Sequence, residues 1–499
     1  MSQPTQSACL GYLSFMTRHH VTVFVLTFCC YAFFHASRKA VSTVKDSLIK
    51  EWTPPNSSHP HLLPAANWQR EPLFSSSKSA KEFTGVLDTA FLLAYSVGLY
   101  LSGILGDRYD QRKLMAGGMA GSAVTVFLFG YATELIHLYS VPVYVSLWLA
   151  NGLLQSVGWP CCVAIIGKWF PERTHGFVFG IWSSCASVGN IIGNSLAALV
   201  VDYGYDLCFL LPASLLLGGA CLILTSLIPD PIELQKPAVR RVSINEEENN
   251  EDESAARSPL LGNVEVTIAS PRQRPPPLGV VGALKIEGVV LFALSYACLK
   301  LVNYAFFFWL PLYIQEKYGW TNAFSDELSS WYDVGGIIAG IICGLLSDLM
   351  WSRSPLLCLF LFLAMPALLA YSWSPEDRIV NAFLMAMAGF FVGGPANIIS
   401  SATCADLGRR PELRGNAEAL GTVTGIIDGT GSMGAALGQA AIPGIQAAYG
   451  WGWVFYLFVS MIGLSLLCVL PVLVRDIKRR FFSNNRAAAG NAAEVQVAE

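Results

Sequence analysis

Twelve apolar runs, each long enough to cross a bilayer as a helix, constrain this chain more than any other feature. A membrane-spanning helix needs about 20 mostly apolar residues. Only 13% of the residues are charged, whereas a soluble domain carries about 25%. The runs are 21–43, 83–105, 114–133, 141–166, 177–200, 207–228, 288–314, 329–350, 355–373, 379–403, 416–442 and 452–474. Helices satisfy their own backbone hydrogen bonds in lipid, so the sequence predicts an all-α membrane protein with twelve transmembrane helices.

The runs fall six and six around one polar segment. That segment is acidic at 245–253, rich in proline at 271–277, and free of aromatic residues. Such a composition cannot bury enough apolar surface to fold. We therefore expect residues 1–228 to form one six-helix bundle, 229–285 a disordered linker, and 286–475 a second bundle. The tail, 476–499, is expected to be disordered as well.

The two halves repeat each other weakly. One constant difference in residue number aligns four residues of the first half with identical residues of the second half, in the same order. Such a repeat favours two pseudo-symmetric bundles with a substrate site between them near the midplane. The matched pairs are Gly103 with Gly344, Asp107 with Asp348, Gly180 with Gly421, and Gly193 with Gly434.

The distribution of basic residues predicts the orientation in the membrane. The loop after the second run carries Arg108, Arg112 and Lys113, and the tail carries a basic cluster at 475–480. Because cytosolic loops are enriched in Lys and Arg, both termini and the linker are predicted to be cytosolic. The first loop then lies on the far side, where Asn56 in Asn-Ser-Ser is a glycosylation acceptor.

The first run contains a basic pair, Arg38 and Lys39, with His35 one helical turn before Arg38. A cation at the centre of a membrane helix costs about 2.5–3.5 kcal/mol, so it usually faces a water-filled cavity or a partner. We interpret this pair as an anion-binding site. The alternative is that both side chains mark the membrane boundary and extend outward to water.

Four further charged residues inside apolar runs are candidates for a role. Lys300 is the only cation of the seventh run, and pseudo-symmetry places it opposite Arg38. Two cations from opposite halves suit a doubly charged, phosphate-type anion. Asp333 and Asp428 are candidates to pair with these cations or to take up a proton. Asp88, near the start of the second run, is interpreted as structural, either in an ion pair or at a shallow position near the membrane interface.

The segment Gly103–Lys113 connects the second and third runs, and Gly344–Asp348 is its degenerate copy. Its small residues allow close helix approach, and an aspartate with a nearby arginine can latch the cytosolic ends. Gly429–Gly434 matches a dinucleotide-binding pattern, but it lies in an apolar helix and follows no strand. The sequence shows no catalytic constellation, metal site or phosphate-cradling loop, so we expect neither an enzyme nor a cofactor, and no nucleic acid partner.

Six stretches carry a family resemblance over nearly the whole chain outside the linker and tails. They are HASRK (35–39), NGLLQSVGWP (151–160), WSSCASVGN (182–190), KLVNYAFFFWLP (300–311), WYDVGGII (331–338) and EALGTVTGIIDGTG (418–431). With the loop motif at 103–113, they resemble the organophosphate:phosphate antiporter family of the major facilitator superfamily. Within that family, which includes glucose-6-phosphate and glycerol-3-phosphate transporters, the chain is most similar to the sugar phosphate exchangers.

The resemblance implies roles for individual residues. Arg38 corresponds to the family's phosphate-binding arginine, with Lys39 beside it. The second basic ligand of the family falls at Asn303, one turn after Lys300. Leu99 and Ala186 stand where bacterial members carry a lysine and a histidine. The implied candidates for coupling are Asp428, Asp333 and His35, and those for the gating loop are Gly103, Asp107, Arg108, Arg112 and Asp348.

The implied function is exchange of a phosphate-bearing organic anion for inorganic phosphate by alternating access in the lipid bilayer. Two alternatives stay open. One is a proton-coupled organic-anion carrier, and the other is a transporter-like subunit that acts only with an accessory membrane protein. The family indicates the endoplasmic reticulum, whereas Ser258–Leu261 resembles a lysosomal sorting signal.

Overall fold

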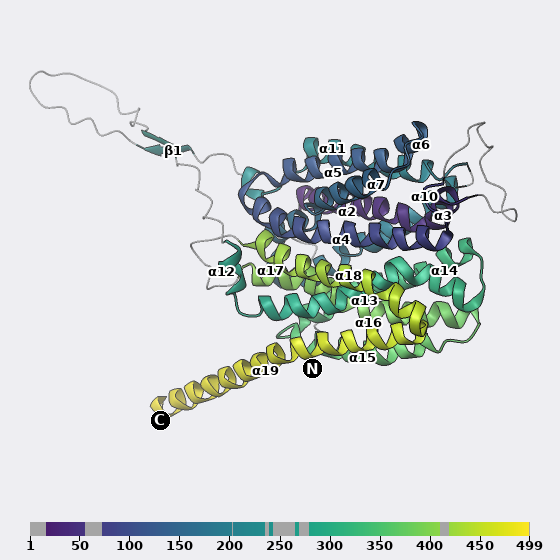
Figure 1. Ribbon diagram of the computed structural model, residues 1–499. Coiled ribbons are helices and arrows are strands. Elements are labelled where there is room, and N and C mark those ends of the chain that lie inside the picture. The colour runs from purple at the N-terminus through teal and green to yellow at the C-terminus, as the bar shows by residue number, and fades with distance from the viewer. Residues whose placement is uncertain are drawn as a thin grey trace, which may run out of the picture.

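The computed structural model describes residues 16–54, 72–201, 203–234, 239–242, 265–268, 279–409 and 419–498. The long helices of the first half form one layer, and those of the second half form another beside it with their axes roughly parallel (Figure 1). Across the boundary, α4 and α8 pack against α18, while α9 and α10 pack against α14. The two predicted bundles therefore meet along a broad interface, where the site lies.

Two of the predicted spans of the first half are each divided into two helices. Residues of the fourth predicted span form two helices that meet at Ser156–Val157, and those of the fifth form two that meet at Ser183–Ser184. The elements are α2 (Arg18–Thr43), α3 (Lys45–Trp52), α4 (Ser77–Arg108), α5 (Gln111–Phe127), η1 (Leu128–Ala132), α6 (Thr133–Leu135), α7 (Val141–Gln155), α8 (Gly158–Trp169), η2 (Glu172–Thr174), α9 (His175–Trp182), α10 (Cys185–Val200) and α11 (Leu207–Ser226).

The second half begins with α13, whose ends are set by glycine. Gly288 and Gly319 flank it with positive φ angles of 100° and 69°, a conformation that glycine adopts without strain. The elements are α13 (Val289–Tyr318), α14 (Asn322–Leu349), α15 (Ser354–Ser372), α16 (Arg378–Ile398), η4 (Ile399–Thr403), α17 (Cys404–Leu407), α18 (Leu420–Tyr449) and α19 (Trp451–Ala498).

Eleven helical segments of the described chain are long and apolar enough to cross a membrane. α18 is not among them, although it has 30 residues and occupies the place of the eleventh predicted span. It is rich in glycine and contains Asp428, and it packs between α4 and α13 (Figure 1). A helix surrounded by other helices does not need a lipid-facing surface, so α18 completes the second set of six.

Glycines hold the two halves together at one end of the molecule. A Cβ added to Gly103 would overlap the backbone of Gly421 and lie 3.2 Å from Gly425. Gly344 packs against Gly176 and Gly180 in the same way, as expected for close helix approach at small residues. The match of Gly180 with Gly421 is therefore wrong by one helical turn, because Gly176 is the residue that packs as Gly421 does.

The same correction applies to the fourth matched pair. Gly434 packs against Ala297 of α13, and its structural equivalent is Gly189, which packs against Ala32 of α2. Gly193 packs against Ala36, one turn further along α2. The loop motifs and these packing glycines are separated by different numbers of residues in the two halves, so one sequence offset cannot match both.

Parts of the polar segments have regular structure. The linker contains η3 (Pro231–Leu234), an antiparallel pair formed by β1 (Val239–Val242) and β2 (Glu265–Ile268), and α12 (Val280–Leu284). The prediction of a disordered tail is corrected, because α19 continues to Ala498 (Figure 1); alanine, frequent in the tail, is the strongest helix former. Asn56 and Ser258–Leu261 lie outside the described residues.

Candidate functional site

Arg38 lies between the two halves and is only 3% exposed. Its Nε donates a 2.6 Å hydrogen bond to Oε1 of Gln155, and its Nη1 lies 3.4 Å from the Tyr304 hydroxyl of the second half. The guanidinium carbon is 4.4 Å from the ring centre of Tyr95, within cation–π distance. Among the described residues, Nη2 has no hydrogen-bond partner. The expectation that Arg38 faces the interior is confirmed, and it retains one free donor group there.

Gln155 is the residue that orients Arg38, and the motif analysis did not single it out. It is the last residue of α7, where the fourth span breaks. Its Nε2 donates hydrogen bonds of 3.0 Å to the hydroxyls of Ser37 and Ser122, and its Oε1 faces Arg38. With the amide fixed in this way, the carbonyl end can only accept. The one available signal was its place within the stretch 151–160.

Lys39 points across to the second half. Its Nζ donates a 3.0 Å hydrogen bond to the carbonyl oxygen of Phe307 and lies 4.4 Å from the centre of that ring. Lys39 is 4% exposed. Both members of the basic pair are thus buried against α13, and neither extends outward to water.

Lys300 is buried, but a carboxylate neutralises it. Its Nζ lies 2.6 Å from Oδ1 of Asp428 and 2.7 Å from the Ser432 hydroxyl, both on α18. The same Nζ is 5.1 Å from the ring centre of Tyr304, whose hydroxyl contacts Arg38. Lys300 therefore faces the site from the opposite half, as expected, in an ion pair that spacing alone could not identify.

A chain of polar contacts connects Arg38 with Asp333. Nη1 of Arg38 lies 3.3 Å from Nε2 of His35, and Nδ1 of His35 lies 3.0 Å from Oδ1 of Asn190. Nδ2 of Asn190 donates a 2.9 Å hydrogen bond to Asp333. In this arrangement a neutral His35 accepts from Arg38 and donates to Asn190. Asn190 connects the two halves, and sequence reasoning did not assign it a role.

A small cavity of about 70 Å³ lies beside this chain of contacts, and Arg38 is not among the residues that line it. His35, Lys39 and Asn190 line one side, and Asn303 and Asp333 line the other. Asn303 accepts a 2.8 Å hydrogen bond from the Tyr332 hydroxyl. Ala186 also lines the cavity. Four predicted site residues thus meet here, whereas Asp428 lies with Lys300 and is not among the residues lining this cavity.

The gating-loop residues divide into two groups. Asp107 accepts hydrogen bonds of 2.9 and 2.8 Å from the backbone amides of Gly421 and Thr422 at the start of α18. Asp348 accepts 2.8 and 2.7 Å bonds from the amides of Gly176 and Phe177 at the start of α9. Each aspartate of the repeated motif therefore binds the N-terminus of a helix in the opposite half, where carboxylates are favoured.

The arginines of the loop are not part of these contacts between the halves among the described residues. Arg112 lies 3.3 Å from Asp110, the residue that caps α5. Arg108 is exposed at the end of α4. Asp88 forms an ion pair with Lys45, which confirms its structural interpretation. The latch between the halves is thus made by aspartates and backbone amides.

Comparison with known proteins identifies one superfamily and, within it, a group of similar proteins that share one name. The family model of the Major Facilitator Superfamily matches residues 23–417. The chain is 48% identical over 479 residues to Sugar phosphate exchanger 3 of Xenopus laevis, covering 94% of this chain and 95% of that protein. It is 46% identical over 475 residues to the Homo sapiens protein of that name, with coverages of 93% and 95%.

More distant proteins agree on the fold. Identity to the glucose-6-phosphate exchanger SLC37A2 of Mus musculus is 36% over 466 residues, covering 91% of this chain and 92% of that protein. The solved structure of the proton:xylose symporter XylE superposes with a TM-score of 0.59 at 12% identity, covering 90% of this chain and 94% of that chain. At that identity the likeness concerns the fold alone.

Proposed function

Because the chain belongs to the major facilitator superfamily and, within it, to the sugar phosphate exchangers, we propose that it exchanges a phosphate-bearing organic anion for inorganic phosphate. The observation that carries this proposal is the buried guanidinium of Arg38, which contacts both halves and keeps Nη2 without a partner in the described structure. A phosphoryl oxygen is an acceptor that such a group binds strongly.

The charges around Arg38 support an anionic substrate. Lys300 is paired with Asp428, and Asp333 lies near enough to Lys39 to interact with it electrostatically. Arg38 has no carboxylate partner among the ion pairs of the described residues. The site thus carries one excess positive charge, and a phosphate group would compensate it.

Exchange follows from this imbalance. The halves must move past each other during alternating access, and an uncompensated buried cation at their interface makes that movement costly. A bound organic phosphate or inorganic phosphate would remove this cost. Without either anion, the transporter would change slowly from one conformation to the other. The relatives' names do not favour the two alternatives, a proton-coupled carrier and an accessory subunit.

The test is counterflow of labelled phosphate in proteoliposomes containing the purified chain. We expect the wild type to exchange phosphate and Arg38→Ala to lose at least about tenfold in rate, because one charge-assisted contact contributes about 1.5–3 kcal/mol. Arg18→Ala is the matched control, since that arginine lies on the same helix as Arg38 but is exposed at its start, away from the site. Wild-type levels of exchange by Arg38→Ala would refute the proposal.

We further propose a membrane of the endoplasmic reticulum as the location, with the lysosome as the runner-up, and cytosolic termini. The proposal rests on the family and on the basic loops. Loss of an endoglycosidase-sensitive mass shift in Asn56→Gln would support a lumenal first loop and modification at that residue. Protease protection of a C-terminal tag in sealed microsomes would contradict the orientation.

A further inference from the structure

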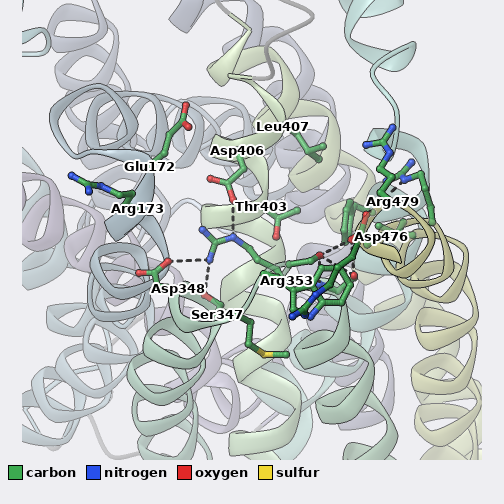
Figure 2. Close-up of a pocket in the computed structure, with 18 residues that line it drawn as sticks. Glu172, Arg173, Ser347, Asp348, Arg353, Thr403, Asp406, Leu407, Asp476 and Arg479 are labelled. Carbon is green, nitrogen blue, oxygen red and sulfur yellow. Dashed lines mark hydrogen bonds and ion pairs between the residues drawn. The ribbon is translucent and has the colours of Figure 1, made fainter. Parts of the chain in front are cut away.

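A second cavity of about 580 Å³ lies at one end of the molecule. The residues that line it are far from Arg38 in the sequence. Its walls come from the ends of α14 and α15, from α17, from the middle of α19, and from Glu172 and Arg173 of η2 in the opposite half (Figure 2). Several arginines line it, and the neighbouring loops are the basic ones predicted to be cytosolic. No residue of this cavity takes part in the site around Arg38.

Three of the acidic groups on its walls already have partners inside the protein. Asp476 accepts hydrogen bonds of 2.5 and 2.6 Å from the hydroxyls of Ser352 and Ser354. Asp406 accepts a 2.7 Å bond from Nε of Arg353, which lies between Asp406 and Asp348 (Figure 2). Asp348 also receives the backbone amides at the start of α9. These carboxylates therefore give the cavity little capacity to bind a cation.

Arg475 differs from these groups because only one side of its guanidinium has a hydrogen-bond partner. Its Nη1 lies 2.6 Å from Oε1 of Glu287, and hydrogen bonds from Arg475 are the main reason that the pKa of Glu287 lies below its usual value. Nε and Nη2 are buried and have no hydrogen-bond partner among the described residues. Nε is 3.8 Å from Asp476, beyond hydrogen-bond distance.

The two unpartnered nitrogens lie on the same edge of the guanidinium plane. That edge presents two parallel N–H groups, which is the geometry that binds two oxygens of a carboxylate or phosphate. Buried donors in proteins nearly always have a hydrogen-bond partner, so two without one on the same edge point to a ligand. Arg480, stacked 5.0 Å from the ring centre of Trp351, also lines the cavity and adds positive charge.

We propose that this cavity binds a phosphoryl-bearing anion, held by the Nε and Nη2 edge of Arg475 and attracted by Arg480 and Arg173. The ligand is either the headgroup of an acidic lipid or a soluble phosphate compound. Exposed apolar side chains on neighbouring turns, Leu349, Ile477 and Phe481, give a lipid a surface for its chains. The anion would contact η2 of one half and α19 of the other, so its binding would stabilise the conformation in which these elements meet.

The test uses the full-length chain with Arg38→Gln, so that phosphate has no central arginine to bind. Thermal unfolding is followed with increasing inorganic phosphate in detergent, and in phosphatidylcholine nanodiscs with and without phosphatidic acid. We expect one of these probes to raise the unfolding temperature. Adding Arg475→Gln should weaken the apparent affinity roughly tenfold, the loss expected for a charge-assisted pair. A response to phosphatidic acid alone identifies a lipid headgroup, and a response to phosphate identifies a soluble ligand.

Two further variants keep the test decisive. Arg480→Gln changes an exposed side chain and is not expected to disturb folding, and it should also weaken the response. Lys113→Gln removes an exposed cation of the other half and should leave it unchanged. No stabilisation by either probe, or equal stabilisation with and without Arg475→Gln, would overturn the proposal. Because Arg38 is absent, this outcome is independent of whether the wild type exchanges phosphate.

Discussion

Arg38 owes its orientation to Gln155, whose amide is fixed by two serine hydroxyls so that its carbonyl faces the guanidinium. The sequence identified the cations because charge in an apolar run is conspicuous, and it identified Asn303 by resemblance. It could not identify Gln155, since a neutral amide in a span has many structural roles. It also could not show that Lys300 and Asp428, far apart in the chain, form one pair.

The contact between Gln155 and Arg38 leads to a first prediction. Gln155→Glu changes little in shape but places a carboxylate 2.6 Å from Nε of Arg38. We expect this carboxylate to compete with the substrate and to raise the concentration of phosphate needed for half-maximal exchange about tenfold or more. Gln155→Met, which removes the acceptor without adding charge, should raise it less. Equal values for the two variants would contradict competition by charge.

The buried pair of Lys300 and Asp428 leads to a second prediction. Asp428→Asn leaves Lys300 buried with a neutral partner, and breaking a buried pair in this way costs about 3–5 kcal/mol. We expect a clear fall in the thermal unfolding temperature of the purified chain. Replacing both residues, Lys300→Met with Asp428→Leu, should recover most of it, because no uncompensated charge remains. A double variant as unstable as Asp428→Asn would show that the pair is not the cause.

At the scale of helices, the two motif aspartates have the same task. Asp107 binds the start of α18, and Asp348 binds the start of α9, so each half clamps one helix end of the other. The sequence predicted a latch at these residues but assigned the partner role to nearby arginines. Backbone amides at a helix start carry no sequence signature, so only the structure could show that they are the partners.

This arrangement gives a third prediction. Asp107→Asn weakens two hydrogen bonds from backbone amides to a charged acceptor, which should destabilise the contact between the halves by about 1–3 kcal/mol. We expect faster modification of Cys161, a fully buried thiol near Gly106, by a small thiol reagent. Asp110→Asn is the comparison, because Asp110 caps α5 and contacts only its own half. Faster labelling in both variants would point to general loosening of the bundle.

For the whole molecule, the apolar runs and their separation by one polar segment were sufficient to predict the two helical layers (Figure 1). Hydropathy decides which segments can lie in lipid, and that property is local in the sequence. The register between the halves is not local, because it depends on which glycines meet. For this reason the spans were predicted well, while the matches of Gly180 and Gly193 were displaced by one turn.

The glycine contacts between the halves also allow the proposed movement to be tested. A side chain at Gly103 would collide with the backbone of Gly421 in the opposite half, whereas one at Gly117 would meet nothing within 4 Å. Gly103→Val should therefore prevent the halves from closing at this end, while each bundle keeps its own packing. Gly117→Val provides a control with the same change in size and helix propensity.

We expect Gly103→Val to abolish phosphate counterflow almost completely, because alternating access requires this end to close once in every cycle. Cys161 should be modified faster in that variant than in Gly117→Val, since the contact beside it stays open. The amount of folded protein should be similar in both. If Gly103→Val exchanged phosphate at the rate of Gly117→Val, the two layers could not be moving against each other at α4 and α18, and the anion would have to cross by another route.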